Sequence, residues 1–292
     1  MTPTPRTRGT RALCALCATA CAAALALTGC GSGGPASPLG TARSANQSRH
    51  VAERFEGHPV VVDDPTGVET ARLLFDASET LVVTDATPEA QLRGASIAVV
   101  AHAPMLVYDP AHREDVVSEI QRLKAFTVLT VGDVTLAART GTVRVFRDPG
   151  GEDALGVMTT LRFGQRDVED PERAARAVAG LDPKAPTWLR AAWADPKVMP
   201  GAEARPFPVH SRRDADMAPA VVATPDSPVA AVANLRSFGA SVTVVDDPDP
   251  RDSEDTLMAM AGLSRAPLLA IGRRFGTGEE LSSRIMRAEE NY

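Results

Sequence analysis

Short apolar runs alternate with amphipathic stretches over most of the chain. The apolar runs are rich in β-branched residues and are continuous, which is typical of strands buried on both faces. They fall at 59–63, 80–84, 104–108, 126–131 and 143–146, and again at 220–224, 241–245 and 267–271. The stretches between them repeat apolar residues at helical spacing, as in GVETARLLFDA, REDVVSEIQRLKA, SPVAAVANLRSF, SEDTLMAMAGL and GTGEELSSRIMRAEE. This order predicts an α/β fold with parallel sheets.

Two parts of the pattern resemble each other, residues 80–132 and residues 220–272. The alignment pairs Val82 with Val221, Asp109 with Asp247, Leu123 with Leu263 and Gly132 with Gly272. We interpret the two parts as duplicated βαβαβ units and expect them to show the same strand order. They predict an N-terminal α/β lobe at 53–149 and a C-terminal α/β lobe at 218–292.

The stretch between the lobes, residues 150–217, has a different composition. GEDALGVMTTLRF, DPERAARAVAGL and DPKAPTWLRAAW predict helices, and ADPKVMPGAEARPFPVHSRR predicts an irregular Pro-rich segment. We therefore expect a helical, Pro-rich connector. It holds both tryptophans, Trp188 and Trp193. We interpret them as burying the connector against a lobe, and the alternative is that they stack on a ligand.

The first residues of the chain have the composition of an export signal. Three arginines and no acidic residue precede an apolar run at 13–27, shorter than the roughly 20 residues of a membrane-spanning helix. The run ends at Leu27-Thr28-Gly29-Cys30, which resembles the lipobox of bacterial lipoproteins. The resemblance implies removal of residues 1–29 as a signal peptide and attachment of lipid chains such as palmitate at Cys30. The alternative is an ordinary secretory signal that leaves Cys30 as a free thiol.

Removal of the signal changes the composition of the chain. It leaves 263 of the 292 residues, with Cys30 as the one cysteine, so the core is expected to be stable without disulfides. The 31 basic residues lose three to the signal, and the remaining 28 stand against 37 acidic residues, a net charge of −9. This charge argues against nucleic acid as a partner. Residues 30–52 show no periodicity and predict a flexible tether. With no later apolar segment of spanning length, we expect a protein held by lipid on the outer face of the cell membrane.

Four of the predicted strands end in Asp-Pro, at Asp64, Asp109, Asp148 and Asp247. Aspartate is a favoured N-cap and proline fits the first helical position, so we interpret the junctions as a repeated βα turn. The carboxyl ends of parallel strands share one edge, where open α/β folds bind ligands. The candidate ligand-binding residues at these edges are Asp85, Asp109 and Asp133 in the first unit and Asp226, Asp247 and Arg273 in the second. Among them Asp85, Asp133 and Arg273 are the poorer capping candidates.

The loop IGRRFGTGEEL at 271–281 has the glycines and arginines of an anion site. Thr277 and Glu280, however, have the spacing of a capping box, which occupies the first amides of the following helix. We therefore interpret the loop as structural. If an anion binds there, Arg273 and Arg274 hold it.

Known catalytic and cofactor motifs are missing from the sequence. It contains no Gly-x-Ser-x-Gly elbow, Walker loop or Gly-x-Gly-x-x-Gly, and GASIA at 94–98 is interpreted as helix packing. The five histidines form no zinc-binding pair, and the signal carries off every cysteine except Cys30. The chain is therefore expected to be a non-enzyme with no cofactor and no metal site.

Residues 67–137 resemble the cell wall-binding repeat 2 family. Glu69-Thr70-Ala71 match the start of a helix in that repeat, 103–107 match its Pro-containing apolar strand, and 128–132 match its last strand. Gly67-Val68 replace an Arg-Tyr pair, and Asp133 replaces a glycine. The resemblance implies α/β modules, often three in a chain, that hold exported proteins on cell-wall polymers. The copy at 220–275 is weaker, and a third copy, if one exists, is lost in the middle segment.

Together these features predict a non-enzymatic, lipid-anchored protein of the cell envelope. It is expected to bind a cell-wall polymer, an envelope glycolipid or a protein partner that handles one. The alternative is a solute-binding lipoprotein of a transporter, which needs several crossovers between two lobes and a polar cleft. A hydrolase with paired carboxylates, such as Asp109 and Asp247, is a third possibility.

Overall fold

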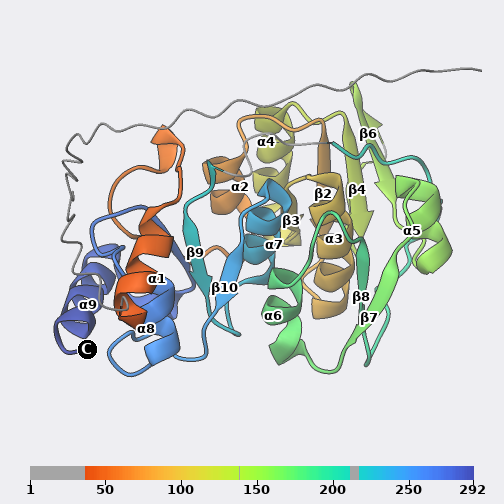
Figure 1. Ribbon diagram of the computed structural model, residues 1–292. Coiled ribbons are helices and arrows are strands. Elements are labelled where there is room, and N and C mark those ends of the chain that lie inside the picture. The colour runs from red at the N-terminus through yellow and green to blue at the C-terminus, as the bar shows by residue number, and fades with distance from the viewer. Residues whose placement is uncertain (1–36, 138, 211–216) are drawn as a thin grey trace, which may run out of the picture. The chain divides into compact units, whose positions relative to one another are not determined.

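The computed structural model describes residues 37–137, 139–210 and 217–292 (Figure 1). Its helices and strands lie in one compact unit, residues 36–292. Cys30 and the expected signal peptide, residues 1–29, lie outside the described residues. In the part that is described, no helix has the length and hydropathy to cross a membrane. The predicted α/β class is confirmed, with parallel strands and helices between them.

The strands of the described residues form sheets that we name A, B and C. Sheet A has the order β1-β11-β9-β10, sheet B the order β3-β2-β4-β6-β5, and sheet C consists of β7 and β8. Neighbouring strands are parallel, except for β5 and β6. The bounds are β1 Val60–Val62, β2 Thr80–Thr84, β3 Met105–Val107, β4 Thr127–Val131, β5 Arg139–Thr140, β6 Val143–Arg147, β7 Gly164–Val168, β8 Thr187–Ala191, β9 Ala220–Ala223, β10 Val242–Val244 and β11 Leu268–Ile271.

Helices follow most of these strands. The α-helices are α1 Pro38–Gln47, α2 Val68–Leu74, α3 Pro88–Ala101, α4 Arg113–Leu123, α5 Glu152–Thr159, α6 Ala174–Ala179, α7 Val229–Phe238, α8 Glu254–Met260 and α9 Gly278–Glu290. The short 3-10 helices include η1 Glu53–Phe55, η2 Pro110–His112, η3 Pro171–Arg173 and η5 Arg273–Phe275.

The two predicted units have the same strand order. In the first unit β2 lies between β3 and β4, and in the second β9 lies between β10 and β11. In both units a helix follows the central strand and another follows the edge strand. Every residue of β2, β4, β9 and β11 is buried, which explains why these strands are continuous apolar runs in the sequence.

The predicted lobe boundaries do not coincide with the sheets. Strand β1 belongs by sequence to the predicted lobe 53–149, yet it pairs with β11 in sheet A. It occupies the position beside β11 that β6 occupies beside β4 in sheet B. The chain therefore enters the first unit through a strand of sheet A, whereas β6, which follows that unit, completes sheet B. Because strand pairing joins residues distant in sequence, the local pattern could not indicate this exchange.

The prediction of a helical connector at 150–217 is wrong in its central part. Residues 164–168 and 187–191 form the parallel strands β7 and β8, joined by η3 and α6. The predicted third helix is thus strand β8, in which Trp188 and Leu189 are buried. The β-branched and aromatic residues at Thr187 and Trp188 are typical of a strand. The middle segment therefore contributes a reduced βαβ unit of its own.

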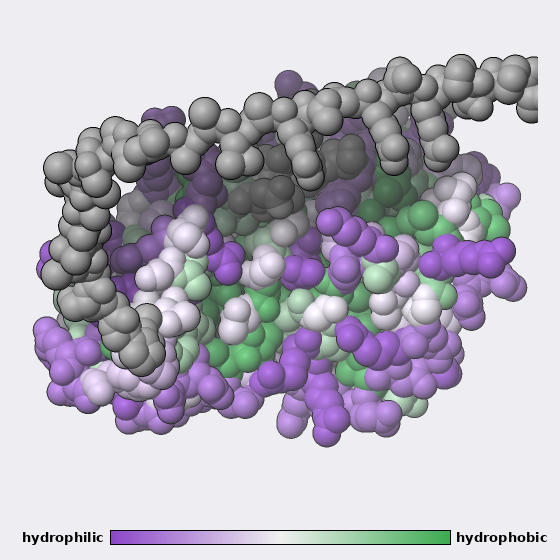
Figure 2. All heavy atoms as spheres, viewed as in Figure 1, coloured by the Kyte–Doolittle hydropathy of each residue, from purple (hydrophilic) through white to green (hydrophobic). Residues whose placement is uncertain are grey.

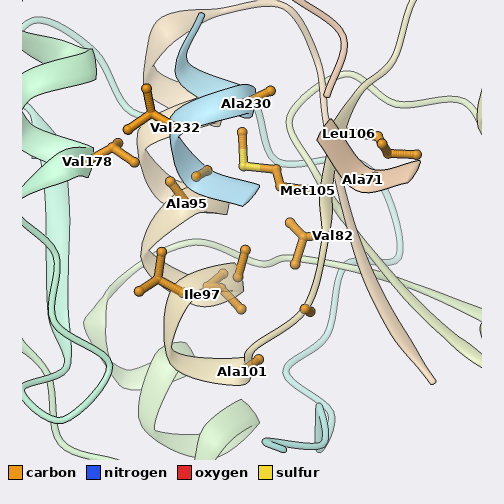
Figure 3. Close-up of a cluster of buried hydrophobic side chains, with 14 of the residues drawn as sticks. Ala71, Val82, Ala95, Ile97, Ala101, Met105, Leu106, Val178, Ala230 and Val232 are labelled. Carbon is orange, nitrogen blue, oxygen red and sulfur yellow. The ribbon is translucent and has the colours of Figure 1, made fainter. Parts of the chain in front are cut away.

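Helices α3, α6 and α7 meet at the centre of the described unit, one from each sheet's crossover (Figure 3). Figure 3 shows Ile97 and Ala95 of α3 beside Val178 of α6 and Val232 of α7. All four side chains are fully buried. The helices therefore place parts of sheets A, B and C around a common apolar core.

Each central helix also covers the edge strand of a neighbouring sheet. Asn234 of α7 bonds both the N–H and the carbonyl of Met105 in β3, at 2.6 and 3.1 Å. Ser96 of α3 accepts a hydrogen bond from the N–H of Leu189 in β8 at 2.9 Å. Arg176 of α6 donates to the last carbonyl of β10 at 3.5 Å. The predicted lobes therefore share a continuous core in the described residues, which is unlike the two lobes about a cleft that a solute-binding protein needs.

Gly94 allows α3 to lie close to β2. A Cβ at this position would overlap the methyl group of Thr84. The interpretation of GASIA as helix packing is thus confirmed, because the glycine faces the sheet at the point of closest approach.

Part of the expected flexible tether, residues 30–52, is helical. Ser37 caps α1 by accepting a hydrogen bond from the N–H of Gly40 at 3.1 Å, and Pro38 occupies the first helical position. Leu39 is buried, and Asn46 donates to two carbonyl oxygens at the end of α8, both at 3.0 Å. The helix was missed because Leu39 is its one large apolar residue. Its position depends on contacts with distant parts of the chain.

Candidate functional site

At the rim of sheet B, Asp85 and Asp133 come together as expected. The Asp85 carboxylate accepts hydrogen bonds from the Thr87 N–H and hydroxyl at 2.8 and 2.5 Å. It also accepts one from the N–H of Asp133 at 2.6 Å. Gly132, at φ 82°, gives Asp85 the room to do so. Asp85, taken from the sequence as a poor capping candidate, thus ties two loops together and is buried.

The loop after β8 reaches this rim. Lys197 in that loop pairs with Asp133 at 2.6 Å. Trp193 in the same loop donates its indole N–H to Glu89, in the first turn of α3, at 3.2 Å. The two tryptophans therefore differ: Trp188 is buried beneath the Arg93 guanidinium, whereas Trp193 lies partly exposed at the rim.

Asp109 lies after β3 and caps η2, as its Asp-Pro junction predicts. Its carboxylate accepts hydrogen bonds from the N–H of Ala111 at 2.8 Å and from the His112 ring at 2.7 Å. The bond to His112 lowers the pKa of Asp109 and raises the pKa of His112. Both side chains are exposed, so a ligand at this point would compete with water for them.

The candidates of the second unit share the rim of sheet A. Asp226 accepts hydrogen bonds from the Thr224 hydroxyl at 2.8 Å and from Arg274 at 3.2 Å. Partial burial opposes ionisation, but these two bonds outweigh it and lower the pKa of Asp226. Asp247 accepts a hydrogen bond from the N–H of Asp249 at 2.9 Å, within its own turn. The aspartates at this rim are therefore engaged in local structure.

A pocket of about 580 Å³ opens beside the first turns of α9, and we name it the α9 pocket. It is lined by Arg273, Arg274, Gly276, Glu279, Glu280, Ser283, Arg284 and Arg287. Arg284 donates to the backbone carbonyl of Phe275, and Arg274 pairs with Asp226. The side chains of Arg273 and Arg287 bond to no described residue and are exposed. Arg273, a predicted site residue, thus lies in a cationic pocket.

The capping box predicted for this loop is present. Thr277 accepts a hydrogen bond from the N–H of Glu280 at 3.2 Å, and Glu280 accepts one from the N–H of Thr277 at 2.9 Å. The second bond lowers the pKa of Glu280. Because these groups occupy the helix N-terminus, any anion in the α9 pocket must bind to the arginines.

A larger pocket of about 610 Å³ runs along β6, and we name it the β6 groove. It is lined by Thr142, Arg144, Val145, Phe146, Arg147, Gly201, Glu203 and Arg205. The Arg205 guanidinium lies 5.5 Å from the centroid of the Phe146 ring and pairs with Glu203 at 2.8 Å. Arg147 donates to a carbonyl of the facing loop at 3.1 Å. Arg144 is exposed and has no side-chain partner in the described part of the chain.

Sequence reasoning missed the β6 groove altogether. Its arginines come from β6 and from the Pro-rich segment around 201–205, which lie far apart in the sequence. For the α9 pocket a partial signal existed, since Arg284 and Arg287 lie three residues apart and so share a helix face.

The described residues offer neither a metal cluster nor the suggested carboxylate pair. Among the described residues, no group of three or more His, Cys, Asp or Glu side chains could hold a metal ion. Asp109 and Asp247, the suggested carboxylate pair, follow edge strands of different sheets. What the described surface offers is guanidinium groups around open pockets, which suit the binding of anions.

Comparisons with known proteins give limited information. No family model matches the chain, and no curated protein matches it. Cwp6 from Clostridium difficile is 14% identical, with a TM-score of 0.47 over 78% of this chain and 48% of that chain. Cwp8 from Clostridium difficile is 15% identical, with a TM-score of 0.46 over 80% of this chain and 52% of that chain. This chain thus spans about half the length of each, and we take its function from its own residues.

Proposed function

We propose that this protein is a non-enzymatic component of the cell envelope, anchored by lipid at Cys30, that binds an anionic cell-wall polymer in the β6 groove. The observation that carries the proposal is the lining of the groove, where Arg144, Arg147 and Arg205 border about 610 Å³ of open space. Guanidinium groups pair bidentately with phosphate and carboxylate. A wall polymer bearing either group therefore fits this lining.

The arginines of the groove differ in their readiness to bind. Arg144 has no side-chain partner among the described residues to give up. Arg205 must give up its ion pair with Glu203 to bind the ligand. The Phe146 ring, on which its guanidinium lies, helps to keep that group in position. The expected charge of −9 outside the signal disfavours general attraction to anionic polymers, so binding depends on this local cluster. Repeated anionic groups along a polymer would let many copies bind in parallel.

The groove is tested by measuring retention of residues 36–292 on fractionated cell-wall polymers. We expect Arg144→Gln combined with Arg205→Gln to weaken retention on anionic polymer by about tenfold or more, because two charge-assisted contacts are removed. The matched control is Arg273→Gln combined with Arg287→Gln, which removes two exposed arginines from the α9 pocket. Equal retention of wild type and the groove variant would show that the polymer binds elsewhere or not at all.

The anchor is tested with Cys30→Ala in the full-length chain. Without the thiol no diacylglyceryl group can be attached, so we expect the protein either to leave the membrane fraction or to keep an uncut signal. Fractionation and mass measurement of the N-terminus report both outcomes. Unchanged processing together with unchanged membrane retention would contradict the lipoprotein proposal and leave the groove experiment unaffected.

A further inference from the structure

Helix α9, which lines the α9 pocket, lies at the end of the unit where the chain enters it. Leu39, in the first turn of α1, packs in one apolar cluster with Ala288 of α9. Arg43 of α1 pairs with Glu289 at 3.2 Å. Ala288 directly follows Arg287, which lines the pocket. Successive residues of a helix point about 100° apart, so α1 meets the C-terminal end of α9 on a different face from the pocket. Figure 1 shows α1, α8 and α9 together at one end of the unit.

The end of the unit that holds α1, α8 and α9 must lie close to the expected lipid on Cys30. Cys30 precedes Pro38 by eight residues, and a fully extended chain of that length spans at most ~28 Å. Helix α9 has 13 residues and is about 20 Å long. A lipid on Cys30 would thus hold α9 within a helix length or so of the bilayer surface.

We propose that the α9 pocket docks on the phosphate headgroups of anionic phospholipids in the membrane that holds the Cys30 lipid. The proposal rests on the lipid anchor proposed above, which brings the pocket to the surface. The docked unit presents its opposite end outward. Figure 1 shows β6 at the end away from α9, so the β6 groove would face the wall while the α9 pocket faces the membrane.

The charges of the pocket favour this partner. Four arginines line it against two glutamates, of which Glu280 is hydrogen-bonded to Thr277. Arg274 and Arg284 pair with Asp226 and Asp249, so the pocket's available positive charge is that of the other two arginines. Arg273 and Arg287 are exposed and have no described partner. Figure 2 shows mainly hydrophilic side chains over the end at which α8 and α9 lie, as suits contact with headgroups. Each arginine at an anionic surface strengthens binding about fivefold, which corresponds to about 1 kcal/mol.

The experiment uses residues 36–292, which carry no lipid, so its result does not depend on Cys30. Binding is measured by co-sedimentation with vesicles of phosphatidylcholine alone and with vesicles that also contain phosphatidylglycerol. We expect wild type to bind only the anionic vesicles. Arg273→Gln combined with Arg287→Gln should bind them at least ~20-fold more weakly, because two contributions of about fivefold are lost. Thermal melting should be unchanged, since neither side chain has a described partner.

Arg144→Gln combined with Arg205→Gln serves as the matched control, with the same charge change in the β6 groove. It should bind the vesicles like wild type. Equal weakening by both variants would mean general attraction of charge and would overturn the proposal, as would equal binding to both vesicles. Displacement from vesicles by soluble glycerol phosphate at the same phosphate concentration would also overturn it, by showing a site for free phosphate. Failure here leaves polymer retention in the β6 groove intact.

Discussion

Replacing Asp148 with alanine is expected to lower the free energy of unfolding of residues 36–292 by about 3–5 kcal/mol. The Asp148 carboxylate accepts two hydrogen bonds from Arg93, from Nε at 2.9 Å and from Nη2 at 3.0 Å. The two side chains are 1% and 2% exposed. Without the carboxylate, a buried guanidinium keeps its charge and loses its partner. Urea denaturation followed by circular dichroism measures the loss.

Asp246→Ala is the matched control. Its carboxylate also pairs with an arginine, Arg176, at 2.5 Å, but is 88% exposed. Exposed pairs contribute at most about 1 kcal/mol, so this variant should melt close to wild type. Arg93→Met combined with Asp148→Ala removes both charges and should recover part of the stability lost by Asp148→Ala alone. If the two single aspartate variants lose equal stability, burial of the Asp148 pair is not what matters.

The Arg93–Asp148 pair shows where a repeated sequence motif stops being informative. All four Asp-Pro junctions predict a cap, yet they differ in the fold. Asp64 accepts two hydrogen bonds from a threonine in α2, and Asp109 caps η2. Asp148 instead pairs with Arg93, and α5 begins after Gly151 with no side-chain cap. Asp247 closes its own turn. What a carboxylate does depends on the residues that other elements bring to it.

In the sheets, too, the positions of strands could be predicted from the local sequence, whereas the pairing of distant strands could not. Strand positions such as 80–84 and 127–131 could be predicted, because a strand buried on both faces must be apolar throughout. That the two duplicated units share one strand order could be predicted from the alignment of one unit on the other. The pairing of β1 with β11 and the existence of sheet C could not be predicted. Both depend on contacts between distant segments, and the local sequence of a segment does not indicate which segment it will contact.

For the candidate site, the positions of the residues could be predicted from the sequence, but their contacts could not. Asp85, Asp133 and Arg273 were correctly expected at the rims of the sheets, since topology alone places the loops after parallel strands there. Their availability was not predictable: Asp85 is committed to neighbouring loops and Asp133 to Lys197. The cationic pockets form from arginines on separate elements, so only the folded chain reveals them.

Asn234→Ala is expected to lower the free energy of unfolding by about 3 kcal/mol, because it strands several buried polar groups. The Asn234 amide accepts a hydrogen bond from the N–H of Met105 at 2.6 Å. It donates to the carbonyls of Gly67 and Met105 and to the Thr70 hydroxyl, at 2.9, 3.1 and 2.9 Å. The side chain thus replaces a neighbouring strand at the edge of sheet B. Urea denaturation of residues 36–292 measures the effect.

Asn234→Asp separates this bonding from packing, because the two side chains have nearly the same shape. The introduced carboxylate can still accept from the N–H of Met105, but it faces the carbonyls of Gly67 and Met105 without a donor. Burial and these carbonyls raise its folded pKa above the ordinary value of about 3.9, so its cost is largest above that range. As pH falls the carboxyl gains a proton that it can donate, and the difference in stability from wild type should shrink.

Asn46→Ala is the control. It removes two hydrogen bonds that hold α1 to α8 at the partly buried edge of the unit, and it should cost less. A cost of Asn234→Asp that stays constant between pH 7 and pH 4 would contradict the role given to the amide donors. Protonation of the carboxylate, which restores a donor, would then recover no stability.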